Sequence, residues 1–383
     1  MKKTICLLIA LLLCAALLSG CQQKPETTDV TDAGSTTETA APQTDTGDDD
    51  TGVEAGAVLN VFNWGEYIDT DMNVIREFER KYNCRVNYKT YESNEILYTQ
   101  IMAGDSWDIL IPSDYMIERL IREKKLQPID KSIVTNLDLL TPGVQNLEFD
   151  PDNTYMVPYL WQTVGIVYDK TKIDPAKVEE MGWEIFRDPE YEGHTYMYDS
   201  ERDAFMIAFK ALGFSANTEN EEEIQAAYEW LLDMNSAVHP SYVTDEVIDA
   251  MAQGHKWLAL VYSGDAAYIL SENEDMAYCT PKQGTNIAVD AMVIPANASN
   301  PKLANLFIKY ILDYDASLAM STDVGYASAN AQVLTELSGP GGAYEGNSAY
   351  LPRAGYPLDE FYHDNETLRT RLSDLWFKVM SAK

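Results

Sequence analysis

The stretch Val58-Leu-Asn-Val-Phe-Asn-Trp64 predicts a buried strand that ends in polar and aromatic residues. Residues Asp71 to Tyr82 follow, with Val74, Ile75 and Phe78 on one helical face, which is the period of an amphipathic helix. The alternation continues, with elements expected at Arg85–Tyr91 (strand), Asn94–Met102 (helix), Trp107–Pro112 (strand) and Tyr115–Lys125 (helix). Strands that alternate with short helices predict βαβ units, and hence an α/β fold with a mainly parallel sheet.

The same pattern resumes beyond Pro158 and predicts a second group of elements. Strands are expected at Thr163–Tyr168, His194–Tyr198 and Trp257–Tyr262. Helices are expected at Arg202–Ala211, Glu221–Met234, Thr244–Ala252, Pro301–Leu312 and Leu368–Met380. Two such groups, in a chain whose 46% apolar content can fill sizeable cores, predict two lobes of roughly 100–200 residues each.

The first residues have the layout of an export signal. Lys2 and Lys3 precede an apolar run from Ile5 to Leu18, which is too short for a comfortable membrane span. Small residues then lead to Cys21, as in a bacterial lipobox. The sequence therefore predicts a signal peptide over residues 1–21 and lipidation of Cys21, in preference to an ordinary cleavage site with an incidental cysteine.

Residues 22–57 are rich in Thr, Asp, Glu, Gly and Ala and include the run Asp48-Asp49-Asp50. Such a segment has too few apolar residues to offset the entropy cost of ordering, so it predicts a disordered acidic tether. A lipid anchor followed by a flexible tether holds a domain near a membrane without embedding it. No later stretch reaches about eighteen apolar residues, so no membrane span is expected.

The net charge of −33 argues strongly against nucleic acid as a partner. Excess acidic residues keep a protein soluble and raise the local concentration of cations. A solubilising surface explains most of this charge, so the charge permits a cationic ligand without identifying one.

Of the five cysteines, Cys6 and Cys14 lie in the signal peptide and Cys21 is the expected lipid site. Cys84 and Cys279 remain, and the sequence leaves open whether they form one bridge. The four histidines are scattered, and no Cys/His cluster has metal-ligand spacing. No metal site and no cofactor is expected.

Aromatic and acidic residues follow nearly every expected strand. Ligands bind beyond the carboxyl ends of the strands in open parallel sheets, so these residues are candidates for one site. Any one of them alone is more often a packing or capping residue, and their recurrence is the signal. In chain order they are Trp64, Glu66, Tyr67, Ser113, Asp114, Tyr115, Tyr159, Trp161, Asp199, Ser200, Asp203, Tyr262, Asp265, Asp290 and Tyr326.

Carboxylates combined with aromatic rings suit a ligand that is cationic at its ends and apolar between them. Carboxylates attract ammonium groups, ring faces attract cations, and ring walls cover methylene groups. Basic residues are absent from these positions except Arg202, which is expected to pair with a neighbouring acid. An anionic ligand would need several basic residues, so a linear amine fits better.

From about Leu59 onward, the chain resembles the spermidine/putrescine-binding proteins of polyamine ABC importers. The resemblance rests on several short motifs in the same order and with similar spacing. They are Asn63-Trp-Gly-Glu-Tyr67, Thr90-Tyr-Glu-Ser-Asn-Glu95, Ile111-Pro-Ser-Asp-Tyr115, Val157-Pro-Tyr-Leu-Trp161, Ile294-Pro-Ala-Asn297 and Val324-Gly-Tyr326.

The resemblance implies the two-lobed periplasmic-binding-protein fold (type II), with a sheet flanked by helices in each lobe and a hinge between them. The chain is then expected to cross between lobes near Val164–Ile166, near Thr285–Ile287 and after Leu334. Lobe 1 would comprise residues 58–163 and 288–335, and lobe 2 residues 164–287 and 336–383.

The resemblance also carries ligand-binding roles to individual positions. Glu66 matches an amine-binding acid, Asp290 the central carboxylate and Asp203 a family glutamate. Asp265 fits the acid that putrescine-preferring members supply. The expected ligand-binding set is Trp64, Glu66, Tyr67, Ser113, Tyr115, Asp203, Tyr262, Asp265, Asp290 and Tyr326.

Three positions depart from the family pattern. Ala288 stands where a large aromatic residue commonly covers the methylene chain of the ligand. Ser200 stands where a further acid is usual, with Asp199 beside it. A family amide ligand falls around Tyr362. These departures bear on ligand length and affinity.

The chain is therefore expected to be a non-catalytic, extracytoplasmic lipoprotein that captures putrescine or spermidine. It would deliver the polyamine, as a monomer, to the permease subunits of an ABC importer. The alternatives are a receptor for another small cationic solute and a polyamine sensor. A secreted hydrolase that uses Glu66, Asp203 and Asp290 is a weaker alternative, because no nucleophile or metal motif accompanies these acids.

Overall fold

The computed structural model of the chain describes residues 52–65, 67–69 and 71–382. The expected signal peptide, Cys21, most of the tether and Glu66 lie outside these residues. The chain divides into two units, Met1–Thr46 and Gly47–Lys383, and the helices and strands of the described residues all lie in the second unit.

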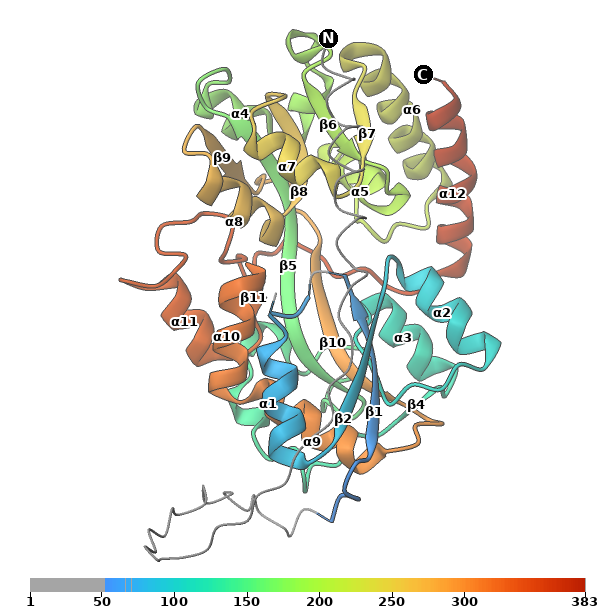
Figure 1. The fold of residues 1–383 in the computed structure, drawn as a ribbon. Helices are drawn as coiled ribbons and strands as arrows, with labels where there is room; N and C mark the ends of the chain where they lie inside the picture. Colours follow the sequence, from blue (N-terminus) through green and yellow to red (C-terminus); the bar gives the residue numbers. More distant parts are fainter. Residues whose placement is uncertain (1–51, 66, 70, 383) are drawn as a thin grey trace, which may run out of the picture. The chain divides into compact units, whose positions relative to one another are not determined.

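The expected βαβ units of the first lobe are present, as Figure 1 shows. Strand β1 pairs in parallel with β2 along its whole length and with β3 on its other edge. Apolar periodicity accounts for the helices between these strands, since α1 buries Val74, Ile75 and Phe78. The elements are β1 Val58–Trp64, α1 Asn73–Tyr82, β2 Arg85–Tyr91, α2 Asn94–Ala103, β3 Ile109–Leu110, α3 Asp114–Arg122 and β4 Leu126–Gln127.

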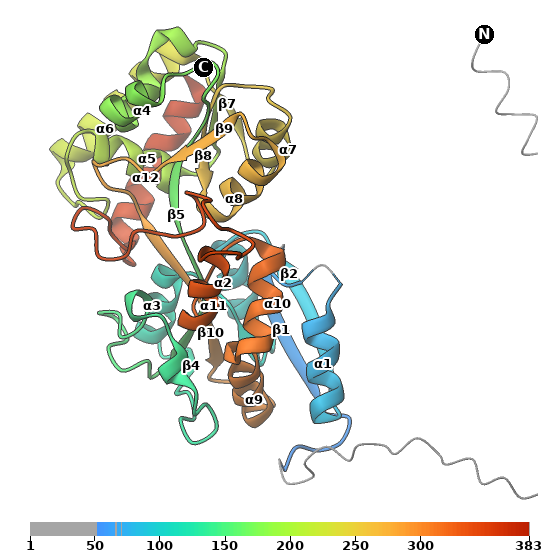
Figure 2. The same cartoon turned by 90° about the vertical axis from the view of Figure 1, so that its left-hand side faces the viewer.

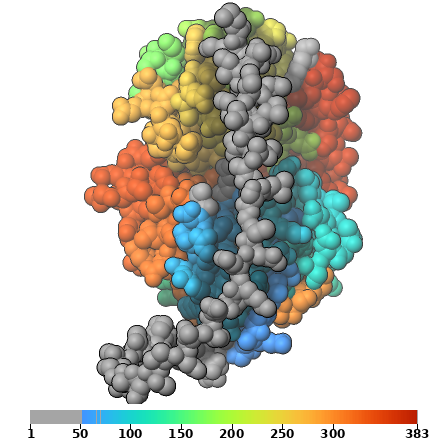
Figure 3. Space-filling view, viewed as in Figure 1, coloured from blue at the N-terminus to red at the C-terminus, as the bar shows by residue number. Residues whose placement is uncertain are grey.

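The second lobe also contains parallel pairs, with β6 between β7 and β8. Helices α5 and α6 pack on each other, and the C-terminal helix α12 packs on both. Figure 3 shows α12 in red at the surface. The elements are α4 Pro175–Met181, β6 Thr195–Tyr198, α5 Glu201–Ala211, α6 Glu221–Val238, β7 Ser241–Val243, α7 Glu246–Ala252, β8 Leu258–Tyr262, α8 Ser263–Glu272, β9 Met276–Cys279 and α12 Glu366–Ser381.

Two long strands, β5 (Met156–Asp169) and β10 (Ile287–Pro295), join the lobes, as Figures 1 and 2 show. β5 pairs antiparallel with β10 up to Thr163 and antiparallel with β8 from Val164. The two-lobed α/β fold is confirmed, but the sheet is mixed rather than mainly parallel. The βαβ pattern reports only local neighbours and carries no signal for these crossing strands.

The remaining elements follow β10 in the chain. Helices α9 and α10 lie next to each other, and β11 pairs antiparallel with β5 at Trp161. These elements are α9 Pro301–Leu312, α10 Tyr314–Val324, β11 Ala327–Ser328 and α11 Ala331–Ser338. None of the helices in the described part of the chain combines the length and the apolarity needed to cross a membrane.

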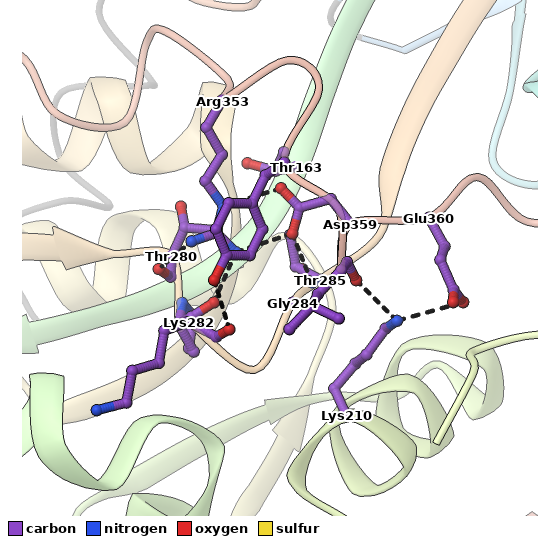
Figure 4. Close-up of polar contacts among 12 residues, drawn as sticks. Thr163, Lys210, Thr280, Lys282, Gly284, Thr285, Arg353, Asp359 and Glu360 are labelled. Carbon is purple, nitrogen blue, oxygen red and sulfur yellow. Dashed lines mark hydrogen bonds and ion pairs between the residues drawn. The ribbon is translucent and has the colours of Figure 1, made fainter. Parts of the chain in front are cut away.

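A C-terminal segment also joins the hinge region. The backbone N–H of Glu360 donates to Thr285 O, and the N–H of Ile287 donates to Glu360 O, both at 2.9 Å. The Asp359 carboxylate accepts the N–H of Thr285 at 2.9 Å and pairs with Arg353 at 2.8 Å, as Figure 4 shows. The sequence places the third crossing just after Leu334, whereas these contacts to the hinge are made further along the chain.

A buried lysine ties the same segment to the second lobe. Lys210, on α5, is 3% exposed. Its Nζ donates to Leu358 O at 2.8 Å. The same Nζ lies 3.2 Å from the Glu360 carboxylate, as Figure 4 shows. Cys84 and Cys279, whose pairing the sequence left open, are free thiols.

Candidate functional site

Asp290 lies on β10 at a point where the pairing with β5 shifts register. Its side chain is nearly inaccessible, at 2% exposure. Ser113, at the start of α3, donates its hydroxyl to Asp290 Oδ1 at 2.6 Å, and Tyr67, just after β1, donates to Oδ2 at 2.8 Å. Two hydroxyl groups of the first lobe thus orient one buried carboxylate.

Burial raises the pKa of Asp290 to about 6, and the hydrogen bonds from Ser113 and Tyr67, with a contribution from Trp64, hold it from rising further. The carboxyl group is therefore mostly ionised at pH 7. Among the ion pairs of the described residues, none involves Asp290. The indole Nε1 of Trp64 is also buried without a well-formed hydrogen bond to any described residue.

Asp265 lies in the first turn of α8, where the chain leaves β8. Tyr326 donates its hydroxyl to Asp265 Oδ1 at 2.9 Å, and Tyr198, the last residue of β6, donates to Oδ2 at 3.1 Å. One donor comes from the first lobe and the other from the second. This carboxylate therefore connects the two lobes through tyrosines.

Asp203 lies in the first turn of α5, whose N-cap is Ser200. Ser200 donates its hydroxyl to Asp203 Oδ2 at 2.7 Å, and so does Tyr262 from the end of β8, also at 2.7 Å. Tyr362, in the C-terminal segment, donates to Oδ1 at 3.2 Å. Asp203 is 5% exposed, so these hydroxyls supply most of its polar surroundings.

The phenols around these carboxylates are protonated donors. Burial, and then the neighbouring carboxylates, raise the pKa values of Tyr67, Tyr198, Tyr262, Tyr326 and Tyr362 well above the ordinary value. An ionised carboxylate can accept about four hydrogen bonds. Asp290, which accepts two hydroxyl groups, therefore keeps acceptor capacity for a further donor.

Ring contacts connect the three carboxylate groups. The rings of Tyr67 and Tyr326 meet edge to face with centroids 5.0 Å apart, and those of Tyr198 and Tyr262 stack at 4.5 Å. At the start of α2, Asn94 Nδ2 donates to Ser113 Oγ at 3.1 Å and to the Tyr115 hydroxyl at 2.9 Å, which links Ser113 to Tyr115.

Arg202 completes a closed circuit of side chains. Its guanidinium lies 3.9 Å from the centroid of the Tyr115 ring and 4.9 Å from that of Tyr362. The expectation that Arg202 pairs with an acid is wrong, because no ion pair among the described residues includes it and it stacks on two rings instead. We call this circuit the polar ring; it comprises Tyr67, Asn94, Ser113, Tyr115, Tyr198, Arg202, Asp203, Tyr262, Asp265, Asp290, Tyr326 and Tyr362.

Most of the expected site residues lie in the polar ring. Trp64 borders it, with its indole 6.5 Å from the Tyr67 ring and 4.6 Å from that of Tyr91. Of the expected set, only Glu66 falls outside the described residues. A surface pocket lined by Leu147, Ser215 and His363 shares no residue with the polar ring.

Sequence reasoning missed four members of the polar ring. Tyr198 is the last residue of an expected strand, so the strand-end argument could have included it. Asn94 belongs to the motif Thr90-Tyr-Glu-Ser-Asn-Glu95, which supports the family resemblance. Arg202 is expected from the sequence to pair with an acid, and Tyr362 is expected only as the place where a family amide falls. No local pattern indicates that the C-terminal segment returns to α5.

Other expected strand-end residues support the site from within the sheet. Tyr159 and Trp161 lie in the middle of β5, not after a strand. Tyr159 donates its hydroxyl to Tyr67 O, and Trp161 Nε1 donates to Ser328 O at 3.1 Å. Asp199 does not replace the acid absent at Ser200, since it accepts a hydrogen bond from Trp376 of α12 at 3.2 Å.

Residues 73–342 match the profile of the bacterial extracellular solute-binding proteins. The spermidine/putrescine-binding periplasmic protein of Salmonella typhimurium is 32% identical over 274 residues, which are 71% of this chain and 77% of that protein. The putrescine/cadaverine-binding protein of Pseudomonas aeruginosa is 29% identical over 73% of this chain and 81% of its own length.

Solved structures agree with the sequence comparisons. The spermidine/putrescine ABC transporter substrate-binding protein of Streptococcus pneumoniae superposes with a TM-score of 0.74 and 30% identity, covering 85% of this chain and 99% of that one. A protein of Listeria monocytogenes superposes with a TM-score of 0.75 and 32% identity, covering 86% and 100%. The chain belongs to the bacterial extracellular solute-binding proteins.

Proposed function

We propose that the polar ring binds a small linear polyamine, putrescine or spermidine, which the protein delivers to an ABC importer. The observation that carries this proposal is the convergence of Asp203, Asp265 and Asp290 in one circuit of tyrosines. Carboxylates are separated by tyrosine side chains around this circuit, and amine groups are separated by methylene groups along a polyamine.

The energies of these contacts are adequate for tight binding. A carboxylate about 4 Å from an ammonium group contributes on the order of 4 kcal/mol before desolvation, at an effective dielectric constant near 20. A cation over a ring adds roughly 0.5–2 kcal/mol, and each buried methylene about 0.8 kcal/mol. The polar ring contains three aspartates and one arginine, and a dication would reduce that imbalance of charge.

Direct titration tests the proposal. We expect putrescine or spermidine to bind in calorimetry at pH 7.5 and to raise the midpoint of thermal unfolding. A neutral sugar and a dicarboxylate serve as controls. Stabilisation by either control, with none by any polyamine, would refute the proposed ligand class.

A second candidate ligand is a cationic amino acid, and Arg202 is the observation that favours it. The guanidinium lies in the polar ring without a carboxylate partner among the described residues, and it could pair with the carboxylate of such a ligand. Competition between putrescine and lysine or ornithine separates the two candidates.

The remaining parts of the proposal concern the setting of the site. Signal cleavage before Cys21 and lipidation of its thiol would anchor a monomer outside the cytoplasmic membrane, with residues 22–57 as the tether. Lobe 1 would comprise 58–163 and 288–335, and lobe 2 164–287 and 336–383. Glu66 would add a fourth acid. We expect the site to bind without catalysing a reaction, because Asp203, Asp265 and Asp290 each accept hydrogen bonds from hydroxyl groups and no nucleophile motif accompanies them.

A further inference from the structure

Gln162 lies on β5 where the strand passes from one lobe to the other. Its pairing partner on β10 is Ala288. Two residues later, Val164 already pairs with Tyr262 of β8, whose hydroxyl belongs to the polar ring. Gln162 therefore lies in the sheet between the parts of the polar ring that each lobe supplies.

The strand register determines where the Gln162 side chain projects. Ala288 and Asp290 are two residues apart on β10, so their side chains point to the same face of the sheet. Gln162 is directly opposite Ala288 and Leu160 is opposite Asp290, so Gln162 projects to that face as well. This is the face on which the Asp290 carboxylate meets Ser113 and Tyr67.

In the pair formed by Gln162 and Ala288, one side chain is long and the other is a single methyl group. Ala288 contributes only a methyl group at the position where the family resemblance implies a large aromatic residue. Directly opposite Cβ atoms in an antiparallel pair are about 4.5–5.5 Å apart, so the longer Gln162 side chain reaches the space beside Ala288. An amide thus lies where an aromatic wall is the usual arrangement.

The amide has an unused acceptor. Gln162 Oε1 is buried and has no hydrogen-bond partner among the described residues. A buried acceptor without a hydrogen-bond partner is energetically unfavourable, so a ligand that donates a hydrogen bond to it gains affinity. Ammonium groups are strong donors to such an oxygen.

We propose that Gln162 is a specificity-determining ligand contact, whose Oε1 accepts a hydrogen bond from an N–H of the bound ammonium group. This inference rests on the proposed function. The pair Gln162–Ala288 replaces contact with the methylene chain by recognition of an amine nitrogen at the same place. The site therefore selects where the nitrogens of the ligand lie, and not only how long the ligand is.

Calorimetric titration of Gln162→Met with putrescine and spermidine tests the contact. Methionine keeps the length and flexibility of the side chain and removes the acceptor. We expect the Kd for the better ligand to rise by about 10- to 100-fold, the range for a hydrogen bond to a charged group. Gln162→Glu retains an acceptor and is expected to bind at least as tightly as the native chain. Gln145→Met, at a partly buried glutamine outside the polar ring, is the matched control.

A second experiment tests whether the Gln162 side chain occupies the space beside Ala288. Ala288→Trp alone is expected to weaken polyamine binding, since Gln162 takes up the space, and Gln162→Gly combined with Ala288→Trp is expected to recover part of the loss. The inference would be overturned, with polyamine binding intact, if Gln162→Met bound with native affinity. It would also be overturned if the affinity lost in the double variant equalled the sum of the losses of Gln162→Gly and Ala288→Trp. A native chain that binds no polyamine would overturn the proposed function and this inference together.

Discussion

Replacing Asp290 by asparagine separates the binding role of its charge from its structural role. The substitution keeps the shape of the side chain and one oxygen acceptor for Ser113 or Tyr67. It removes a charge that burial makes unfavourable, as the pKa of about 6 indicates. Ligand affinity and stability without ligand should therefore change in opposite directions.

The raised pKa of Asp290 and the usual cost of unpairing a buried charge set the expected size of the two effects. The pKa of Asp290 rises from 3.8 to about 6, so ionisation in the folded chain costs about 3 kcal/mol, at 1.36 kcal/mol per pH unit. At pH 7.5, Asp290→Asn relieves this cost, so the protein without ligand should be at least as stable as the native chain. Loss of one partner from a buried charge pair costs about 2–5 kcal/mol of affinity. The Kd for a polyamine should therefore rise roughly 30- to 4,000-fold.

Calorimetry with putrescine and spermidine, and thermal unfolding with and without each, measure the two effects. Asp150→Asn is the matched control, because Asp150 is also buried, at 2% exposure, and accepts backbone N–H groups of Thr154, Tyr155 and Met156 at 2.9, 2.9 and 3.1 Å. This control should lose stability and keep its affinity. An Asp290→Asn chain that binds polyamine within threefold of the native Kd would refute the reasoning.

Three further predictions concern pH, the hinge and the thiols. Polyamine affinity should rise between pH 5 and 7 as Asp290 ionises, and calorimetry in two buffers at pH 5 should detect proton release on binding; a flat affinity profile would contradict this. Because the folded pKa of Asp290 is raised, the contribution of this group to stability without ligand should fall over pH 4 to 6. Asp359→Asn should lower the free energy of unfolding by about 3 kcal/mol in urea titrations, because its fully buried carboxylate pairs with Arg353 at the hinge. A loss below 1 kcal/mol would show that this ion pair does not stabilise the fold. Cys84 should react slowly with iodoacetamide at pH 8 in the folded chain, since burial raises its thiol pKa to about 11. Rapid labelling of Cys84, or a bridge to Cys279, found by peptide mapping would disprove this prediction.

The closed polar ring has a consequence for how the lobes stay together. Tyr326 of the first lobe donates to Asp265 of the second, and Arg202 of the second lies over Tyr115 of the first. If the polar ring binds a polyamine as proposed, a ligand ammonium that approaches Asp265 would share its carboxylate with Tyr326. Binding and the contacts between the lobes would then use the same groups, as expected of a receptor whose lobes close on a ligand.

The sequence by itself determined part of the element order and the residue types of the site. Helical and strand periods depend on neighbours a few residues apart, so most of the elements that were expected, such as β1, β2 and α9, lie within a few residues of their expected bounds, whereas β10, α8 and α10 were not expected at all. Acidic and aromatic residue types at strand ends indicated a cationic ligand, because the carboxyl ends of parallel strands share one edge of the sheet.

Only the tertiary structure decided which residues meet. Tyr67 and Asp290 are 223 residues apart in the chain, and Tyr362 and Asp203 are 159 apart. The antiparallel pairing of β5 and β10 places Gln162 opposite Ala288, and the backbone bonds of Glu360 with Thr285 and Ile287 return the C-terminal segment to the hinge. Such pairings depend on long-range register, and no local period in the chain encodes it.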